Sequence, residues 1–467
     1  MPNLRTPAER ADAARTLAKM FELVEYQGHL YMPVHFMTAK IDDIEGNDTK
    51  VWTTLDKKEI RFLANRVAGV LFGAPSEEVG FRLMLSQFAT AAEKSDGILV
   101  RMGTERVQLL QEDGTFTEPT GEFVANYLDV PYQTADKTLA TYLFGVITEW
   151  VGSKEAAISL LHHIATALQP KWSAVKYVIL LGSGRNGKST LMKMVYALLG
   201  KRNVSKVKRQ DMAKQSTIIT ALNGKLMNIV FDGPKEFIKD SSAEKTLIAG
   251  EPLDIELKYE NMPFEVQTNA LFMEGLQHEP KVSDKSQALQ ARLVRFKFPN
   301  KYAKDLMFEK KMLREEMLAA LLQLLLDHWV NENELDEKLA LTAESLDMQM
   351  SAIWAMSPVL RFLEWMALRD QKFLQEIVAK QMVVEKFMTN YRKWLENNGY
   401  RNMEDDYILQ TLNDNFEMKR KTVRPEGKPT TRLCIVGLAQ DTDNAIQTLL
   451  QGGQLEHADV DTAVLED

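Results

Sequence analysis

The hydrophobic pattern of the first 170 residues alternates between short strands and helices. Short apolar runs within residues 20–57 and 97–119, the second containing an Asp-Gly turn, are typical of strands. Residues 57–95 and 138–168 carry apolar side chains at spacings of three and four, which predicts helices. This part of the chain is therefore predicted to be mixed α/β and then helical.

After Pro170 the pattern changes to strand, loop and helix. Compact apolar runs at 177–181, 225–231, 269–273 and 291–298 predict four buried strands. Helical segments separate several of them, an arrangement that is typical of an α/β sheet. We therefore expect an α/β core in this part of the chain.

Two further patterns occur, one within this core and one after it. Residues 253–266 alternate in polarity as a hairpin does, and they precede the third predicted core strand. From Tyr302 onward the chain is predicted to be mostly helical, and it closes with a strand pair within residues 416–438.

Composition narrows the class of protein. The chain has 467 residues, of which 45% are hydrophobic and 26% charged, as in ordinary globular proteins. No apolar run is long enough to cross a membrane, and the charged N-terminus does not resemble a signal peptide. The single cysteine, Cys434, excludes an internal disulfide and a cysteine zinc site. We expect a cytoplasmic protein, in the host cell cytoplasm if the source is viral.

Charge is segregated along the chain although the net charge is −8. Residues 171–215 hold eleven Lys or Arg against one acid, Asp211, and residues 418–432 form a second basic cluster. The terminal residues 455–467 hold five acids and no Lys or Arg. A polyanion responds to the local field rather than to the sum, so this distribution favours a nucleic-acid partner.

A glycine-rich segment lies directly between the first core strand and a helix. It matches G-x-x-x-x-G-K-[ST] and comprises Gly182, Ser183, Gly184, Arg185, Asn186, Gly187, Lys188 and Ser189, with Thr190 next. Glycines let backbone N–H groups surround phosphates, and the following helix N-terminus favours negative charge. Lys188 is predicted to contact the β and γ phosphates, and Ser189 a Mg²⁺ ion. The segment predicts a site for ATP and Mg²⁺.

Asp232 follows the apolar run at 225–231. Such a site needs a carboxylate at the tip of a neighbouring strand, where it organises Mg²⁺ and the attacking water. We therefore predict that Asp232 and Ser189 are the metal ligands. The alternative for Asp232 is a solvated residue that only ends its strand.

Residues 95–440 resemble a superfamily 3 helicase of the poxvirus and phage or plasmid primase–helicase type. The resemblance is carried by Asn186 before Gly-Lys, by GILVRMGTERVQLLQEDGTFTEP, by ALQARLVRFKFPNKY, and by SPVLRFLEWM, YRKWLENNG and RLCIVGL in that order. It implies an α/β fold with a P-loop AAA+-like ATPase core, a mostly helical collar and a C-terminal helical and winged-helix region. It also implies a ring, commonly a homo-hexamer.

The resemblance and the patterns together suggest six segments. They are an N-terminal mixed α/β region at 1–95, a helical collar with a short β lead-in at 96–170, the ATPase core at 171–300, a helical extension at 301–355, a winged-helix-like DNA-binding region at 356–440 and an acidic tail at 441–467. The first segment shows no acid or zinc pattern of a primase, so no fused primase is expected.

The resemblance also implies roles for residues outside the loop. Arg292 matches the arginine finger supplied in trans, and Arg295 is either a second sensor arginine or a flanking ion-pair residue. Lys258 and Tyr259 fall near the tip of a hairpin that would hold DNA, by a phosphate contact and by stacking; the alternative is a plain surface hairpin.

Two basic segments leave their roles open. In the C-terminal strand pair, Lys419, Lys421 and Arg424 are predicted to contact DNA as the wing, with a charged edge strand as the alternative. The segment 201–214 either lines the channel of the ring or is a solvated face.

The sequence departs from the family at two positions. Gly233 follows Asp232 where the family has a second acid, and Glu236 serves instead only if the turn through Pro234 returns it. The sensor asparagine is absent, and Glu274 lies near its position. Glu274 is either the water-activating base or Gln277 takes the asparagine's role, because an ionised carboxylate cannot donate a hydrogen bond.

These observations predict an ATP-dependent replicative DNA helicase of a virus, phage or plasmid. The resemblance implies 3′→5′ movement on single-stranded or forked DNA, with a separate primase, polymerase or single-strand-binding protein as partners and no membrane contact. One alternative is an origin-binding or loading ATPase with weak or regulatory hydrolysis. Another is a ring ATPase that acts on protein, which the clustered basic charge disfavours.

Overall fold

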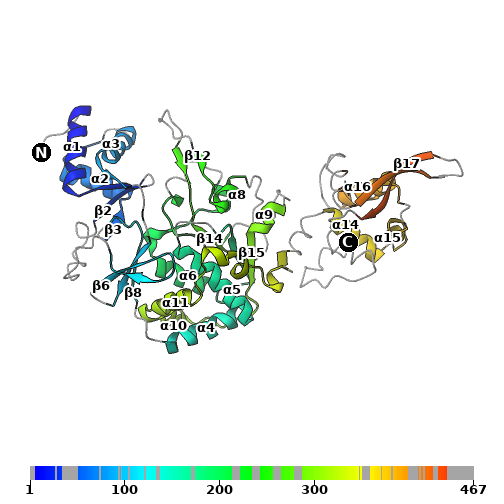
Figure 1. Ribbon diagram of the computed structural model, residues 1–467. Helices are drawn as coiled ribbons and strands as arrows, with labels where there is room; N and C mark the ends of the chain where they lie inside the picture. Colours follow the sequence, from blue (N-terminus) through cyan, green and yellow to red (C-terminus); the bar gives the residue numbers. More distant parts are fainter. Residues whose placement is uncertain are drawn as a thin grey trace. The chain divides into compact units, whose positions relative to one another are not determined.

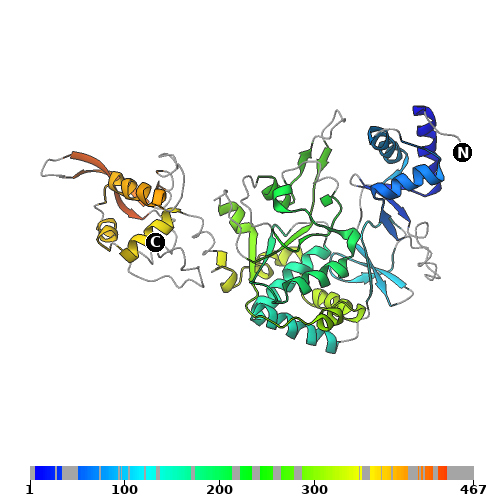
Figure 2. The same cartoon turned by 180° about the vertical axis from the view of Figure 1, so that it is seen from behind.

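The computed structural model divides the chain into two compact units, Met1–Gln349 and Met350–Asp467. The residues it describes are 6–26, 29–33, 51–72, 75–92, 95, 97–103, 106–119, 122–132, 137–169, 174–212, 221–233, 242–255, 264–277, 287–346, 348–349, 358–369, 371–379, 382–397, 409, 412–413, 416–423 and 430–438. Figures 1 and 2 show the two units from opposite sides. Within the described residues no helix is long and apolar enough to cross a membrane.

The N-terminal region combines helices with a small sheet. Its elements are α1 (Pro7–Met20), β1 (Val24–Tyr26), β2 (His29–Pro33), β3 (Trp52–Thr54), α2 (Lys57–Phe62), a π-helix η2 (Leu63–Val67), α3 (Pro75–Phe88) and β4 (Thr90–Ala91). The sheet order is β3-β2-β1-β4. Helix α1 begins with a capping box in which Thr6 and Glu9 satisfy each other's backbone N–H groups. The predicted strands at 20–57 and helices at 57–95 are therefore present.

A second small sheet and a helix pair follow. They comprise β5 (Ile98–Met102), β6 (Arg106–Leu110), β7 (Phe116–Thr117), β8 (Tyr127–Tyr132), α4 (Lys137–Val151), α5 (Lys154–Ala165) and the 3-10 turn η3 (Thr166–Leu168). The sheet order is β7-β6-β5-β8. The short strands and the following helices agree with the sequence pattern.

A five-stranded parallel sheet forms the centre of the first unit. Its order is β10-β11-β14-β9-β15, with β9 at Tyr177–Leu181, β10 at Val204–Ser205, β11 at Met227–Val230, β14 at Leu271–Leu276 and β15 at Leu293–Lys297. Strands β10, β11 and β14 lie on one side of β9 and β15 on the other, so the direction of chain progression changes at β9. The carboxyl ends of all five strands meet at one edge, and this edge carries the loop that follows β9.

Further elements of the first unit surround the central sheet. They are α6 (Lys188–Leu199), η4 (Lys201–Asn203), η5 (Arg209–Asp211), α8 (Ser242–Ala249), β12 (Leu253–Ile255), β13 (Phe264–Val266), α9 (Gln287–Arg292), α10 (Leu306–Met312), α11 (Glu315–Asp327), η6 (Glu332–Glu334) and α12 (Leu335–Lys338). Strands β12 and β13 pair antiparallel, so the hairpin predicted at 253–266 is confirmed at its base.

The two faces of the central sheet differ in chemistry. One face is apolar: Val178, Leu180, Ile229 and Phe296 join the main core together with side chains of α4, α5, α6 and α11. Alternate residues point to opposite faces of a strand, so the other face carries Tyr177, Asn228, Glu274 and Arg295, all of them buried. Figure 1 shows α4, α5, α10 and α11 gathered on one side of the sheet and β12, α8 and α9 on the other.

The second unit has its own core. It comprises α14 (Pro358–Arg369), α15 (Gln371–Val378), α16 (Val384–Asn397), β16 (Phe416–Val423) and β17 (Thr430–Leu438). Strands β16 and β17 pair antiparallel, and an isolated bridge joins Val383, before α16, to Cys434 in β17. Aromatic side chains fill the interior, with Phe362 beside Phe387 and Tyr391.

Candidate nucleotide-binding site

The glycine-rich loop 182–187 joins the end of β9 to the start of α6. Gly184, Arg185 and Gly187 have positive φ angles of 97°, 55° and 93°. Left-handed residues of this kind turn successive backbone N–H groups toward one concavity, which is the geometry of an anion-binding nest. The concavity opens at the N-terminus of α6, where the helix dipole adds to the attraction for anions.

Two glycines of the loop are required by close neighbours. A Cβ at Gly187 would lie 2.6 Å from the ring of Trp150 in α4. A Cβ at Gly182 would lie 1.9 Å from the Asn186 side-chain nitrogen. The loop is thus packed against its surroundings, and any side chain at these positions would displace it.

The loop is also fixed by hydrogen bonds to the segment after β15. The Asn186 side-chain amide donates to the Phe298 carbonyl at 3.1 Å, and the Tyr302 N–H donates to the Arg185 carbonyl at 2.8 Å. Trp150 and Tyr302 were not predicted as site residues. Their contacts bridge distant parts of the chain, so no local sequence pattern indicates them.

Lys188 is folded back into the loop. Its ammonium donates to the Gly182 carbonyl at 2.5 Å and to the Asn186 Oδ1 at 3.0 Å, and only 7% of the residue is exposed. Burial lowers the pKa of Lys188 to about 8, and the negative charge of Asp232 opposes this shift. The neighbouring Ser189 is exposed. The cation is therefore held where a phosphate bound by the loop would meet it.

Asp232 lies at the same edge as Lys188, two residues after the end of β11, and is exposed. The Gly233 that follows it is packed closely: its N–H donates to the Gly275 carbonyl at 3.0 Å, and a Cβ there would lie 2.3 Å from Glu274 Oε1. Gly233 therefore fits a position with no room for the second acid that the family resemblance implies. The other candidate, Glu236, lies outside the described residues.

Glu274 does not stand at the end of its strand. It is the fourth residue of β14, in register with Val230 and Ile179, and is fully buried. Gln277 is instead the first residue after β14 and is exposed at the edge that carries the loop. Gln277 and Glu274 are the two residues considered in place of the missing asparagine. The structure places Gln277 at the strand end, whereas Glu274 lies inside the sheet in contact with Gly233.

The two arginines near β15 occupy different environments. Arg292 ends α9 and is half-buried, and the next residue, Leu293, pairs with Tyr177 at the start of β9. It therefore lies at the sheet edge opposite to the loop of its own chain. Arg295 is fully buried within β15, and its guanidinium donates to the Gln290 side chain at 2.7 Å. This enclosure matches a packing role for Arg295 rather than contact with a nucleotide.

The predicted nucleic-acid contacts are described only in part. Lys258, Tyr259 and Arg424 lie outside the described residues. Lys419 and Lys421 are exposed on β16, where the Lys419 ammonium pairs with Glu417 at 2.5 Å.

The basic residues of segment 201–214 fall into two groups, arginines with structural contacts and exposed lysines. Arg202 binds the N-terminal region by donating to the Thr54 carbonyl at 2.8 Å, and Arg209 is buried. Lys201, Lys206 and Lys208 are exposed, with the Lys206 ammonium 4.3 Å from the centre of the Tyr196 ring. Two arginines of the segment are thus structural, and these three lysines are open to a ligand.

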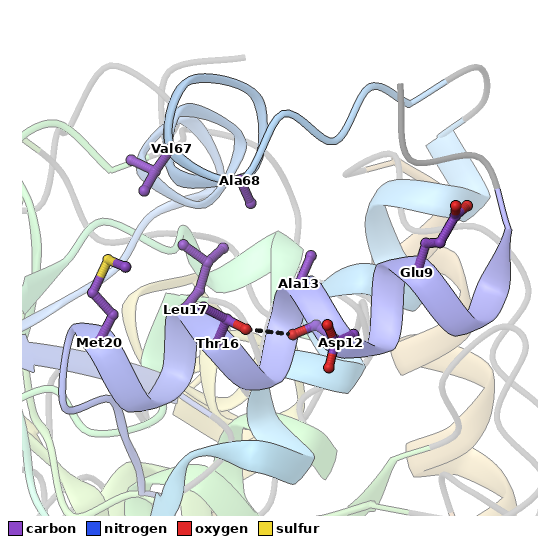
Figure 3. Close-up of a pocket in the computed structure, with 8 residues that line it drawn as sticks. All are labelled: Glu9, Asp12, Ala13, Thr16, Leu17, Met20, Val67 and Ala68. Atoms are coloured by element: carbon purple, nitrogen blue, oxygen red, sulfur yellow. Dashed lines mark hydrogen bonds between the residues drawn. The ribbon is translucent and has the colours of Figure 1, made fainter. Parts of the chain in front are cut away.

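The residues at the loop fit a magnesium nucleotide. No group of three or more His, Cys, Asp or Glu in the described parts of the chain could hold a metal alone. Mg²⁺ in phosphate sites needs only one or two carboxylates, because substrate oxygens and water complete its shell. Exposed Ser189 and Asp232 at one edge meet that requirement. The pocket in Figure 3 is elsewhere, between α1 and η2, and is lined by residues such as Glu9, Leu17 and Val67.

Residues 180–292 match the model of a family of unknown function (DUF5906). This range runs from the loop through Asp232 to Arg292. No curated protein matches the sequence.

Two solved structures are similar over most of the chain. The A form apo structure of the NrS-1 C-terminal region has a TM-score of 0.50 at 12% identity, covering 90% of this chain and 99% of that chain. The apo structure of the NrS-1 C-terminal region (305–718) has a TM-score of 0.45 at 13% identity, covering 92% of this chain and 100% of that chain. At such identities the first likeness shows a shared fold and nothing finer.

Proposed function

We propose that this protein is an ATP-dependent DNA helicase with a P-loop AAA+-like core. The observation that carries the proposal is the convergence of Lys188, Ser189 and Asp232 at the carboxyl edge of the central sheet. They lie where chain progression reverses at β9, the position at which open parallel sheets bind their ligands. A buried lysine, an exposed hydroxyl and an exposed carboxylate around an anion nest suit a nucleoside triphosphate better than any other common ligand.

Each residue at this edge has a definite task in such a reaction. The ammonium of Lys188 would leave its contacts with Gly182 and Asn186 and neutralise phosphate charge. Ser189 and Asp232 would hold Mg²⁺, which when bound supplies charge neutralisation and alignment of the phosphates. The Gln277 side-chain amide, at the end of β14, can donate a hydrogen bond to phosphate or water.

The position of Arg292 supports action between subunits. It lies at the opposite sheet edge from its own loop, so within one chain it cannot approach the phosphates. In a ring of identical subunits, one edge of each sheet can face the loop edge of the next. We therefore propose a homo-oligomeric ring, of which a hexamer is the form implied by the family resemblance, with Arg292 supplied in trans.

The second unit supports DNA binding. The order α15, Val383, α16, β16 and β17, with Val383 bridged to β17, is compatible with the winged helix that the family resemblance implies. Exposed Lys419 and Lys421 lie on its hairpin. We propose single-stranded or forked DNA as the substrate and a role in replication, with any primase supplied by another protein.

The proposal is tested by ATP turnover with and without single-stranded DNA, and by strand separation on a forked duplex. The parental protein should hydrolyse ATP faster with DNA, and Lys188→Ala should abolish turnover. Lys193→Ala is the matched control, because Lys193 lies on the same helix and its ammonium pairs with Glu309 rather than with the loop. Slow hydrolysis that DNA leaves unchanged, with no strand separation, would refute the helicase and support a loading ATPase.

A further inference from the structure

An ion pair is buried on the polar face of the central sheet. Arg209, at the start of η5, donates from Nε to Glu244 Oε1 of α8 at 2.6 Å, and the two side chains are 1% and 2% exposed. Burying such a pair costs several kcal/mol per ion before the attraction offsets it, and apolar residues of similar size usually stabilise a fold at least as well. The pair is therefore expected to contribute little to the free energy of unfolding, and we expect another role for it.

Tyr177 and Glu274 lie beside this pair. The Arg209 guanidinium carbon is 5.5 Å from the centre of the Tyr177 ring. Burial raises the pKa of the Tyr177 hydroxyl well above its ordinary value, and the adjacent Glu274 carboxylate raises it further. Burial lowers the pKa of Arg209, but the influences of Glu244, Tyr177 and Glu274 together outweigh it and raise this pKa above its ordinary value. Arg209 thus pairs with Glu244 and lies near the Tyr177 ring, and we refer to Arg209, Glu244, Tyr177 and Glu274 as the buried charge cluster.

Arg209 is not saturated by hydrogen bonds in this position. Among the residues that the structure describes, neither Nη1 nor Nη2 of Arg209 has a hydrogen-bond partner, and Oε2 of Glu244 has none either. Open donors beside an open oxygen of Glu244 allow the guanidinium to change its bonds without moving its backbone. In a low-dielectric interior such a redistribution changes the energy steeply.

One end of the buried charge cluster touches the candidate site. Glu274 is in contact with Gly233, the residue directly after Asp232, since a Cβ there would fall 2.3 Å from Glu274 Oε1. A shift of the turn at Asp232 and Gly233 therefore presses on the Glu274 carboxylate.

The other end of the cluster reaches the hairpin through α8. Helix α8 carries Glu244 and leads through Gly250 into β12. The Gln267 side chain, just after β13, donates to the Gly250 carbonyl at 2.8 Å and so ties both strands of the hairpin to the end of α8. Figure 1 shows β12 beside α8.

We propose that the buried charge cluster couples the turn at Asp232–Gly233 to α8 and its hairpin, with Arg209 as the positioning residue between Tyr177 and Glu244. A nucleotide at the loop would shift Gly233 against Glu274, the shift would pass to Tyr177 and Arg209 on the same sheet face, and the bond from Arg209 to Glu244 would carry it to α8. This inference rests on the proposed function, because it requires a nucleotide at the loop.

The test is hydrogen exchange in α8, β12 and β13 with and without a non-hydrolysable ATP analogue. In the parental protein the analogue should change exchange there by about fivefold or more, the lower end of usual coupling between sites. Glu244→Gln keeps the shape and the acceptor for Arg209 but removes the charge, and Tyr177→Phe removes only the hydroxyl. Both variants should bind the analogue with parental affinity and reduce the exchange change to less than about twofold.

Ser205→Ala is the matched control. It removes a buried hydroxyl that donates to Asn228 Oδ1 at 2.8 Å on the same sheet face and is not part of the buried charge cluster. This variant should keep the parental response. A parental response in both Glu244→Gln and Tyr177→Phe, or a parental protein that binds the analogue without any change in α8 and the hairpin, would overturn the proposal. A parental protein that fails to bind the analogue refutes the proposed function and this inference with it, and the binding isotherm shows which has failed.

Discussion

Raising the pH from 7 to 9 should weaken ATP binding, because it removes the proton from Lys188. Burial lowers the pKa of this lysine to about 8 in the free protein, with Asp232 opposing the shift. Bound phosphate favours the charged ammonium and raises the pKa again, so binding requires the protonated form. The affinity is therefore expected to follow the fraction of Lys188 that carries its proton before ATP arrives.

The magnitude follows from this pKa. With a value of about 8, Lys188 is ~90% protonated at pH 7 and ~10% protonated at pH 9, so the affinity should fall about tenfold over this interval. Loss of affinity at high pH cannot be explained by unfolding caused by the titration of Lys188. The unfolded lysine keeps its proton up to about 10.4, so removing it from the folded state between pH 8 and 10 favours folding.

The assay is equilibrium binding of ATP with Mg²⁺ at pH 7, 8 and 9. Lys188→Met should bind weakly at every pH, with the tenfold dependence absent. Lys225 provides a matched control, because burial, aided by Arg202, lowers its pKa to about 8 as well. Lys225 donates to the Arg202 carbonyl before β11, away from the loop, so Lys225→Met should keep the full pH dependence.

Two results would refute the reasoning. Parental affinity that is constant from pH 7 to 9 would mean that Lys188 keeps its proton in the free loop, against the enclosure seen here. If the pH dependence of ATP affinity survives in Lys188→Met but disappears in Lys225→Met, the titrating group is Lys225 and not Lys188.

Three further predictions concern other parts of the chain. Arg292→Ala should bind ATP normally but lose turnover on the order of 10³-fold, and mixing it with Lys188→Ala subunits should restore some activity; no recovery in a co-assembled mixture refutes action in trans. His163, whose pKa burial lowers to about 4, binds a proton first in the unfolded state, so stability should fall from pH 6.5 toward pH 4 by up to about 3 kcal/mol. Urea unfolding at several pH values checks this, since His163→Gln should lose that part of the acid sensitivity. Neutralising the predicted wing cations should lower the log–log salt slope of DNA binding by about 0.7 per lost contact on single strands or 0.9 on duplex, and an unchanged slope would make them ordinary surface charge. These cations are Lys419, Lys421 and Arg424.

The central strands could be predicted where they are long and buried on both faces. The apolar runs at 177–181 and 225–231 contain β9 and β11, because a parallel sheet covered on both sides shows as a continuous apolar run. Strand β10 has only two residues, too few for an alternating pattern, so the sequence does not indicate it. The predicted strand at 291–298 begins two residues early, since α9 extends to Arg292 before β15 starts. Helix and strand are joined there without a turn residue that would mark the boundary.

The position of the loop could be predicted because its motif is local, whereas the position of Glu274 could not. Gly182 to Ser189 is one contiguous motif, and the structure places it between β9 and α6 as expected. The predicted strand at 269–273 puts Glu274 directly after its end, but pairing with β9 continues through Leu276 and leaves Glu274 inside the sheet.

That difference of a few residues changes the chemistry open to each side chain. Glu274 meets Gly233 and the hydroxyl side of Tyr177 in the interior, so the route to the site that we propose for it runs through the turn at Asp232. Gln277 gains the solvent-facing strand end, where an amide can donate to a phosphate as the family's asparagine would. The two departures from the family pattern, Gly233 and Glu274, are therefore one arrangement: the missing side chain at Gly233 leaves the space that Glu274 fills from the neighbouring strand.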